Sequence, residues 1–199
     1  LSPAGREQAA QVAQVLAKLP VAALYASPIE RCVETAEVIA ADASLDVQIV
    51  EGITEVDFGD WQGKLLKDLV SEPLWKVVQV APSNARFPGG ESIREMQARV
   101  VGAIELIVAS HPGELVVAVS HADAIKVAVA HFVGMHIDLY QRLSIAPASY
   151  SVLGFGRFGA SLIKLNATGP LDDIAPAPDD TAPAPDDTAP APDDTAPAP

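Results

Sequence analysis

Hydrophobic residues follow two different spacings along this chain, and the clearest change from one to the other comes just before His121. Residues 115–119 form a run of apolar, mostly β-branched residues, which predicts a strand buried on both faces. From Ala122 onward the apolar residues recur at helical spacing, with three of them on one face: Ile125, Val129 and Phe132. His121 therefore lies at a turn from a strand into a helix.

The same criteria predict the other elements of the chain. Apolar runs predict strands at 21–26 and 47–50, and a terminal hairpin with strands at 150–155 and 160–165. Helical spacing, proline breaks and a capping box that starts at Ser92 predict helices at 3–18, 29–41, 65–70, 73–80 and 92–109. Strands that alternate with helices indicate βαβ units and an α/β fold.

Two of the predicted strand ends carry residues that are suited to bind an anion. In open α/β sheets, ligands bind at the carboxyl ends of strands, where the amides that open the next helix point at negative charge. His121 and the amide of Ala122 occupy that place after one strand. Arg31 follows another strand, in the first turn of a helix, where a cation opposes the helix dipole. Its position favours a function, and the alternative is an exposed helix arginine.

Composition limits the class of protein. Of the 199 residues, 49% are hydrophobic and 20% are charged, enough for one sizeable buried core. No apolar run is long enough to span a membrane, and no signal peptide is visible, so we expect no membrane partner. The single cysteine, Cys32, excludes an internal disulfide and fits a reducing compartment, so we predict a cytoplasmic protein.

The net charge of −13 is concentrated in the C-terminal tail. Residues 171–199 hold eight of the 26 acidic residues and no lysine or arginine, which leaves 18 acidic and 13 basic residues, a net of −5, before them. This balance argues against a nucleic-acid partner. The motif APAPDDT occurs three times in the tail, a composition that predicts an extended, disordered segment and a role in solubility. We therefore predict a folded domain at 1–170 and a tail at 171–199.

Six segments, in this order, resemble the histidine phosphatase superfamily in its phosphoglycerate-mutase-like branch: LSPAGREQA, ASPIERCVETA, ITEVDFGDWQG, FPGGES, VVAVSHADAIK and RLSIAPASYSVL. The resemblance covers residues 1–165 and implies a three-layer α/β/α fold with a mostly parallel sheet. The family's Arg-His-Gly motif, which supplies the phosphorylated histidine, would lie upstream of Leu1. The chain is thus expected to be truncated at its N-terminus and, as given, inactive.

The resemblance also implies roles for individual residues. Arg31, in SPIER, matches a phosphate-binding arginine, and His121, in VSHA, matches the second active-site histidine, which binds the phosphoryl oxygens. Glu55, in ITEVDFGDWQG, matches the acid that protonates the leaving oxygen and later activates water. Such a division suits phosphoryl transfer, which needs cations, a nucleophile and a proton donor. Asp123 is the alternative acid, because the other branch of the superfamily places an aspartate beside this histidine.

Other candidate motifs lack the context that their chemistry requires. Residues 154–159 match G-x-G-x-x-G, but they lie in a hairpin with no helix after it, which argues against a dinucleotide site. His131 and His136 have no acid or cysteine at ligand spacing. We therefore expect neither a cofactor nor a metal. Cys32 has no arginine six residues later, so we interpret it as a small buried thiol.

These observations predict phosphoryl transfer through a phosphohistidine, with a small phosphorylated metabolite as the partner. Hydrolysis of a small phosphate monoester is favoured over a phosphoglycerate-mutase-type isomerisation, because no additional basic cluster is visible that would retain a bisphosphorylated intermediate. A different class, a phosphate-binding protein without catalysis, applies if the chain is complete as given. The sequence does not indicate an oligomeric state.

Overall fold

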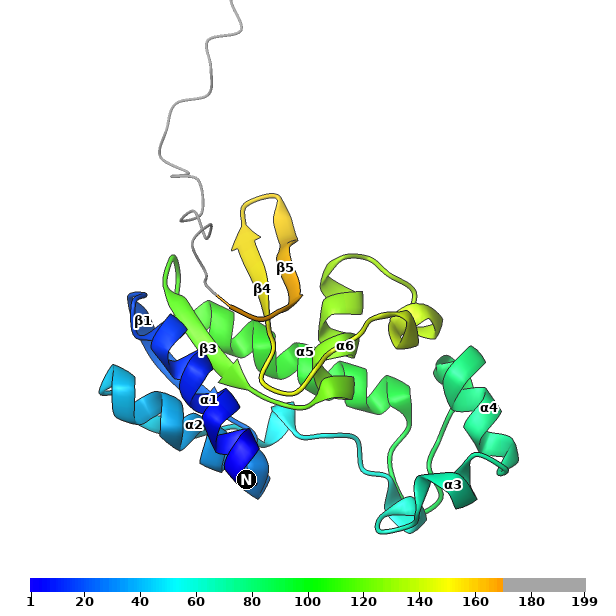
Figure 1. Cartoon of the computed structure of the whole chain (residues 1–199). Coiled ribbons are helices and arrows are strands. Elements are labelled where there is room, and N and C mark those ends of the chain that lie inside the picture. The colour runs from blue at the N-terminus through cyan, green and yellow to red at the C-terminus, as the bar shows by residue number, and fades with distance from the viewer. Residues whose placement is uncertain (170–199) are drawn as a thin grey trace, which may run out of the picture.

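The computed structural model describes residues 1–169 (Figure 1), so the repeats of the tail lie outside the described residues. The helices are α1 (Pro3–Leu16), α2 (Glu30–Ala43), α3 (Leu66–Leu69), α4 (Pro73–Val80), α5 (Ile93–Ser110) and α6 (Ala122–Phe132). The strands are β1 (Val21–Ala26), β2 (Val47–Ile49), β3 (Leu115–Val119), β4 (Tyr150–Gly156) and β5 (Gly159–Ala167). Each predicted helix and strand is present, with ends that differ by a few residues.

Local signals explain where the two longest predicted helices begin. Ser2 caps α1, with its Oγ atom accepting a hydrogen bond from the amide of Gly5, and Pro3 follows at the first helical position. Ser92 and Glu95 form the predicted capping box at the start of α5. Both helices therefore begin at a serine whose side chain accepts a hydrogen bond from a free amide of the first turn.

A parallel three-stranded sheet, in the order β2-β1-β3, forms the centre of the molecule. Side chains of β1 alternate between its two faces: Leu24 packs with α1 and α2, whereas Tyr25 packs with Ile107 of α5. Helices thus cover both faces, which confirms the predicted three-layer architecture. β4 and β5 form a separate antiparallel hairpin.

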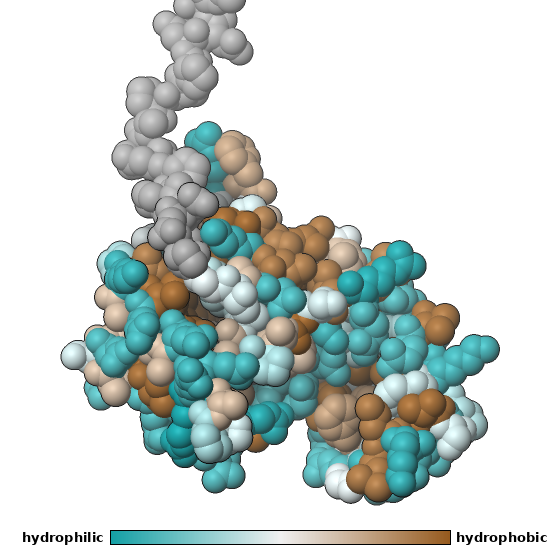
Figure 2. Space-filling model, viewed as in Figure 1, coloured by the Kyte–Doolittle hydropathy of each residue, from teal (hydrophilic) through white to brown (hydrophobic). Residues whose placement is uncertain are grey.

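The largest buried cluster lies away from the sheet, between α5, α6 and the segment that contains α3 and α4. It includes Trp61, Phe87, Met96 and Tyr140, which are all buried. α3 and α4 stand apart from α1 and α2 (Figure 1), and the surface is notched between these two sides (Figure 2). The loop of residues 52–63 crosses from the sheet to α3, so it joins the two sides of the notch.

The structure corrects the predicted burial of β3 and shows how the apolar face of α6 is covered. β3 was expected to be buried on both faces, but its residues are half-buried and Ala118 is exposed, because within residues 1–169 β3 is an edge strand with β1 as its neighbour. In α6, of the three apolar residues expected on one face, Val129 is buried, whereas Ile125 and Phe132 are half-buried. α6 contacts α5, β5 and the 3₁₀ helix η4 (Ile137–Arg142), so more than one of its faces is covered.

Within the described part of the chain, none of the helices is both long and apolar enough to cross a lipid bilayer.

Candidate active site

The register of β1 and β3 brings two distant segments of the chain together. Ala26, the last residue of β1, pairs with Val119, the last residue of β3, and the amide of Ser27 donates to the carbonyl of Val119 at 3.0 Å. The segments that follow both strands therefore leave the same edge of the sheet side by side. Arg31, in the first turn of α2, and His121, just before α6, are placed by this register.

The His121 imidazole is held between two side chains from the β1–α2 turn. Its Nδ1 atom lies 2.7 Å from Nη2 of Arg31, and its Nε2 atom lies 2.7 Å from Oγ of Ser27. Since a guanidinium only donates hydrogen bonds, Nδ1 accepts, and the ring proton of the neutral imidazole is on Nε2, where it donates to Ser27. His121 is 4% exposed and both of its ring nitrogens are bonded, so the orientation of the ring is fixed.

Burial and positive charge keep His121 neutral. Burial is the largest cause that lowers its pKa to about 4, and the charges of Arg31 and Arg99 lower that pKa further. At pH 7 the imidazole therefore carries no charge in the free protein. An anion that binds beside Arg31 would favour the protonated ring, which then has a second N–H to donate.

Cys32 is a buried thiol, as predicted, and lies next to the His121 ring. Its Sγ atom is 3.5 Å from Nε2 of His121 and donates to the carbonyl of Ser120 at 3.4 Å. Burial raises the pKa of this thiol to about 11, although the Arg31 charge acts in the opposite direction. The thiol is therefore protonated at neutral pH, which disfavours Cys32 as a nucleophile.

Glu55 lies on the loop between β2 and α3, close enough to Arg31 and Asp123 for their charges to act on it. Its carboxylate accepts hydrogen bonds from the amides of Val56, at 3.1 Å, and Asp123. Burial is the largest cause that raises its pKa, and the negative charge of Asp123 raises that pKa further. A carboxyl group with a raised pKa is suited to donate a proton near neutral pH.

Asp123, the alternative acid, has a different environment. Lys126, one turn later on α6, donates to the carboxylate of Asp123 at 3.1 Å and to the side-chain carbonyl of Gln141 at 3.2 Å. The carboxylate of Asp123 is thus part of an ion pair on its own helix. Asp123 thus acts on Glu55 through its negative charge, which raises the pKa of Glu55.

The remaining predicted residue, Ala122, is the first residue of α6. His121 is the N-cap residue of this helix by its backbone conformation, yet its ring makes no capping hydrogen bond. The ring is directed instead to Ser27 and Arg31. The ring therefore leaves the amides of the first turn of α6 uncapped, and one of them, that of Asp123, donates to Glu55 instead.

Three residues of the site were not singled out from the sequence: Ser27, Arg99 and Lys126. Ser27 follows β1 directly, as Ser120 follows β3, and this shared position after a strand could have indicated that Ser27 belongs to the site. Arg99 and Lys126 lie on helices whose register toward the site depends on tertiary packing, so no local pattern singles them out.

Residues 1–169 contain no group of three or more histidine, cysteine, aspartate or glutamate side chains that could hold a metal ion. The G-x-G-x-x-G match at 154–159 spans the end of β4, a turn and the first residue of β5. It thus occupies a hairpin, as predicted.

Comparisons with known proteins agree with this geometry. The model of the histidine phosphatase superfamily (branch 1) matches residues 1–168. Phosphoserine phosphatase 1 of Hydrogenobacter thermophilus is 31% identical over 171 residues, which is 84% of this chain and 81% of that protein. A probable phosphoglycerate mutase of Cronobacter sakazakii is 31% identical over 154 residues, 76% of this chain and 71% of that protein. The structure of a mycobacterial glucosyl-3-phosphoglycerate phosphatase with VO3 has a TM-score of 0.77 and 26% identity, covering 84% of this chain and 87% of that chain.

Proposed function

Since this chain belongs to the histidine phosphatase superfamily, we propose that it hydrolyses a phosphate monoester of a small metabolite through a phosphohistidine. One observation carries the proposal. The Arg31 guanidinium and the His121 imidazole meet at 2.7 Å at the carboxyl ends of two paired strands, and Glu55, a carboxyl group with a raised pKa, lies near Arg31.

The proposed reaction has two steps. A nucleophilic histidine nitrogen attacks phosphorus, the bond from phosphorus to the leaving oxygen breaks, and protonated Glu55 gives its proton to that oxygen. Glu55, now a carboxylate, then takes a proton from water, whose oxygen attacks phosphorus as the P–N bond breaks, so that inorganic phosphate and the free histidine are released. Arg31, His121 and the amide of Ala122 bind the phosphoryl oxygens and stabilise their charge in both steps.

The histidines of this chain have other surroundings. His121 is held by Ser27 and Arg31, and His111, at the end of α5, bonds the Tyr25 hydroxyl at 2.7 Å and Glu114 at 2.7 Å. His131 is exposed on α6, and His136 accepts from the amide of Asp138. We therefore propose that the nucleophile lies on a strand upstream of Leu1, as the family resemblance implies.

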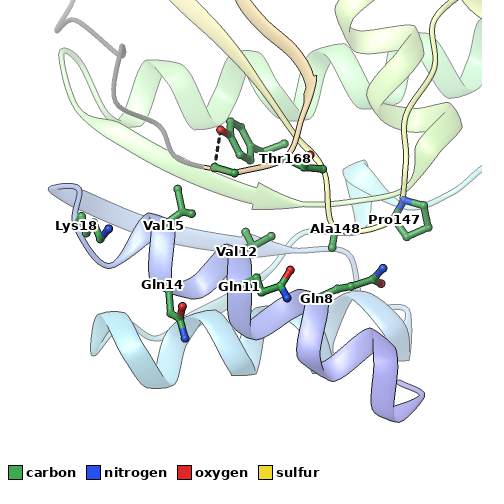
Figure 3. Close-up of a pocket in the computed structure, with 11 residues that line it drawn as sticks. Gln8, Gln11, Val12, Gln14, Val15, Lys18, Pro147, Ala148 and Thr168 are labelled. Carbon is green, nitrogen blue, oxygen red and sulfur yellow. Dashed lines mark hydrogen bonds between the residues drawn. The ribbon is translucent and has the colours of Figure 1, made fainter.

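The edge of β3 offers a place for such a strand. A hollow of about 430 Å³ lies between one face of α1 and the start of the β4–β5 hairpin (Figure 3). Its lining includes Val12, Val15 and Tyr150, and these side chains pack against the same buried cluster as Val117 and Val119 of β3. A parallel strand paired to β3 here would end at the same sheet edge as β1 and β3, beside His121.

The environment of the neighbouring cations supports a phosphatase over a mutase. A mutase must retain a bisphosphorylated intermediate, which calls for additional positive charge. Arg99 and Lys126, the other cations of the site, are each paired with a carboxylate, Glu91 and Asp123 respectively. A mutase remains the second candidate because one of the similar proteins carries that name.

The test starts with the protein isolated from its native source. Its intact mass determines whether residues precede Leu1, and phosphate release is then measured with phosphoserine, 3-phosphoglycerate and other small monoesters, phosphoserine first because a similar phosphatase is named for it. We expect release of phosphate and an acid-labile phosphoenzyme. Isomerisation without release would support the mutase. A native mass equal to this chain, with phosphate binding but no turnover, would instead indicate a non-catalytic phosphate-binding protein.

We also propose that the protein is cytoplasmic, because Cys32 is a free buried thiol, as expected in a reducing compartment. Fractionation of the native cells, with detection of the protein, tests it.

A further inference from the structure

Arg99, on α5, directs its side chain to the main chain of the loop that carries Glu55. Its Nη1 atom donates to the carbonyls of Gly52 and Thr54, at 3.0 and 3.1 Å, and to the Thr54 hydroxyl at 2.8 Å. Its Nη2 atom donates to the carbonyl of Glu55 itself at 3.3 Å. One guanidinium thus joins three residues of the loop, up to and including the proposed acid.

Glu91 extends this arrangement to the other side of Glu55. Its Oε1 atom accepts from Nη2 of Arg99 at 2.5 Å and from the amide of Asp57 at 2.9 Å. The amide of Glu91 also donates to the carbonyl of Asp57 at 3.1 Å. The ion pair therefore bonds the main chain both before and after Glu55. Both side chains are largely buried, with 27% and 18% exposed.

The loop also packs directly on the helix that carries Arg99. A Cβ atom at Gly52 would lie 2.5 Å from the Cβ atom of Ala103, one turn after Arg99. Ser120, at the end of β3, donates to the carbonyl of Ile53 at 2.7 Å. The segment is thus fixed by α5 on one side and by the end of the sheet on the other.

We propose that Arg99 and Glu91 are positioning residues for Glu55: their ion pair bonds the main chain of residues 52–57, so that the Glu55 carboxyl group stays beside the first turn of α6. This inference rests on the role proposed for Glu55. The donors of Arg99 are occupied by one loop and its charge is paired with Glu91, so its main effect is expected on kcat, whereas phosphate affinity depends on Arg31 and His121.

A lysine would not replace Arg99. The guanidinium presents donors in a planar fork that here meets four acceptors of the loop together with Glu91, whereas an ammonium group has three donors on one atom. Arg99→Lys keeps the charge and loses this geometry. It therefore separates an effect of position from an effect of charge.

The experiment compares Arg99→Lys, Arg99→Met and Glu91→Gln in the native full-length enzyme. Arg94→Met is the matched control, because Arg94 also lies on α5 and also donates to a loop carbonyl, that of Ser83, at 2.8 Å. We expect kcat to fall about 10- to 100-fold in all three variants, with KM and the affinity for vanadate changed less than about threefold. Hydrogen exchange of the Asp57 amide should become faster in the same three variants and stay unchanged in the control.

The outcomes distinguish this inference from the proposed function. If a folded Arg99→Met or Arg99→Lys enzyme keeps full kcat while Glu55→Gln loses it, the positioning role is wrong and the function stands. If Glu55→Gln itself keeps full activity, the role of Glu55 falls and this inference falls with it. An increase of KM or a loss of vanadate affinity at constant kcat would show that Arg99 binds phosphate, which also overturns the proposal.

Discussion

Arg31 and His121 follow strands of the sheet, whereas Glu55 lies on a loop that other side chains hold in place. The first pair is positioned by main-chain pairing between β1 and β3, which fixes where α2 and α6 begin. Glu55 depends on Arg99, Glu91 and Ser120, which bond its loop from α5, the turn before α5 and the end of β3. The phosphate side of the site is therefore tied to the stability of the sheet, and the acid side to a few polar contacts.

The largest expected effect is on the phosphate side. Arg31→Ala should lower kcat of the native full-length enzyme by about 10³- to 10⁵-fold, because it removes a cation from the transferring group. Steady-state phosphate release measures this change. Arg6→Ala is the control, since Arg6 is an exposed arginine of α1 that pairs with Glu34. Unchanged kinetics in Arg31→Ala would remove this residue from the site.

The acid side should respond through pH. Glu55→Gln should lower kcat by about 10²- to 10⁴-fold and remove the limb of the pH profile that reports the protonated acid. Asp123→Asn should keep this limb but move it to lower pH, because the negative charge of Asp123 raises the pKa of Glu55. Profiles of kcat/KM for both variants measure this. Loss of the limb in Asp123→Asn alone would assign the acid to Asp123.

A third prediction links His121 to stability. The folded-state pKa of His121, about 4, lies below its ordinary value of 6.5, so the unfolded chain binds a proton between these values and the folded chain does not. The free energy of unfolding should therefore fall as the pH falls, by about 1–2 kcal/mol between pH 7 and pH 5 from this group.

Urea unfolding at the two pH values measures this difference, and His121→Gln should lack that part of it. His131→Gln, at an exposed position of α6, is the control and should keep the full pH dependence. An equal pH dependence in the wild type and in His121→Gln would contradict the assignment.

The smallest expected effects test the contact between the loop and α5. Gly52→Ala should lower the free energy of unfolding by about 1–3 kcal/mol, because its Cβ atom would overlap with Ala103. Gly102→Ala is the matched control on α5: nothing lies within 4 Å of its Cβ atom, so it should raise stability by about 0.5–1 kcal/mol. Thermal and urea denaturation measure both. A stable Gly52→Ala protein would show that the loop is free to move away from α5.

Regular structure and local motifs made it predictable that Arg31 and His121 lie together at strand ends. The apolar run before His121 and the break after Ala26 located two strand ends, and parallel pairing brings such ends together. Glu55, the proposed acid, was singled out by family resemblance alone, because Arg99 meets Glu55 across 44 positions of the chain and no local spacing encodes that contact. The burial of β3 was misjudged for the same reason, since the number of neighbours of a strand is a tertiary property.

The first turn of α6 has a thermodynamic consequence. His121 begins this helix without capping it by its ring, so a bound phosphate oxygen would add an acceptor to the first turn, where the amide of Asp123 already donates to Glu55. Part of the free energy of anion binding would then order the helix, and the melting temperature should rise with the logarithm of the phosphate concentration. Binding of the anion would thus complete the ordering of this helix start.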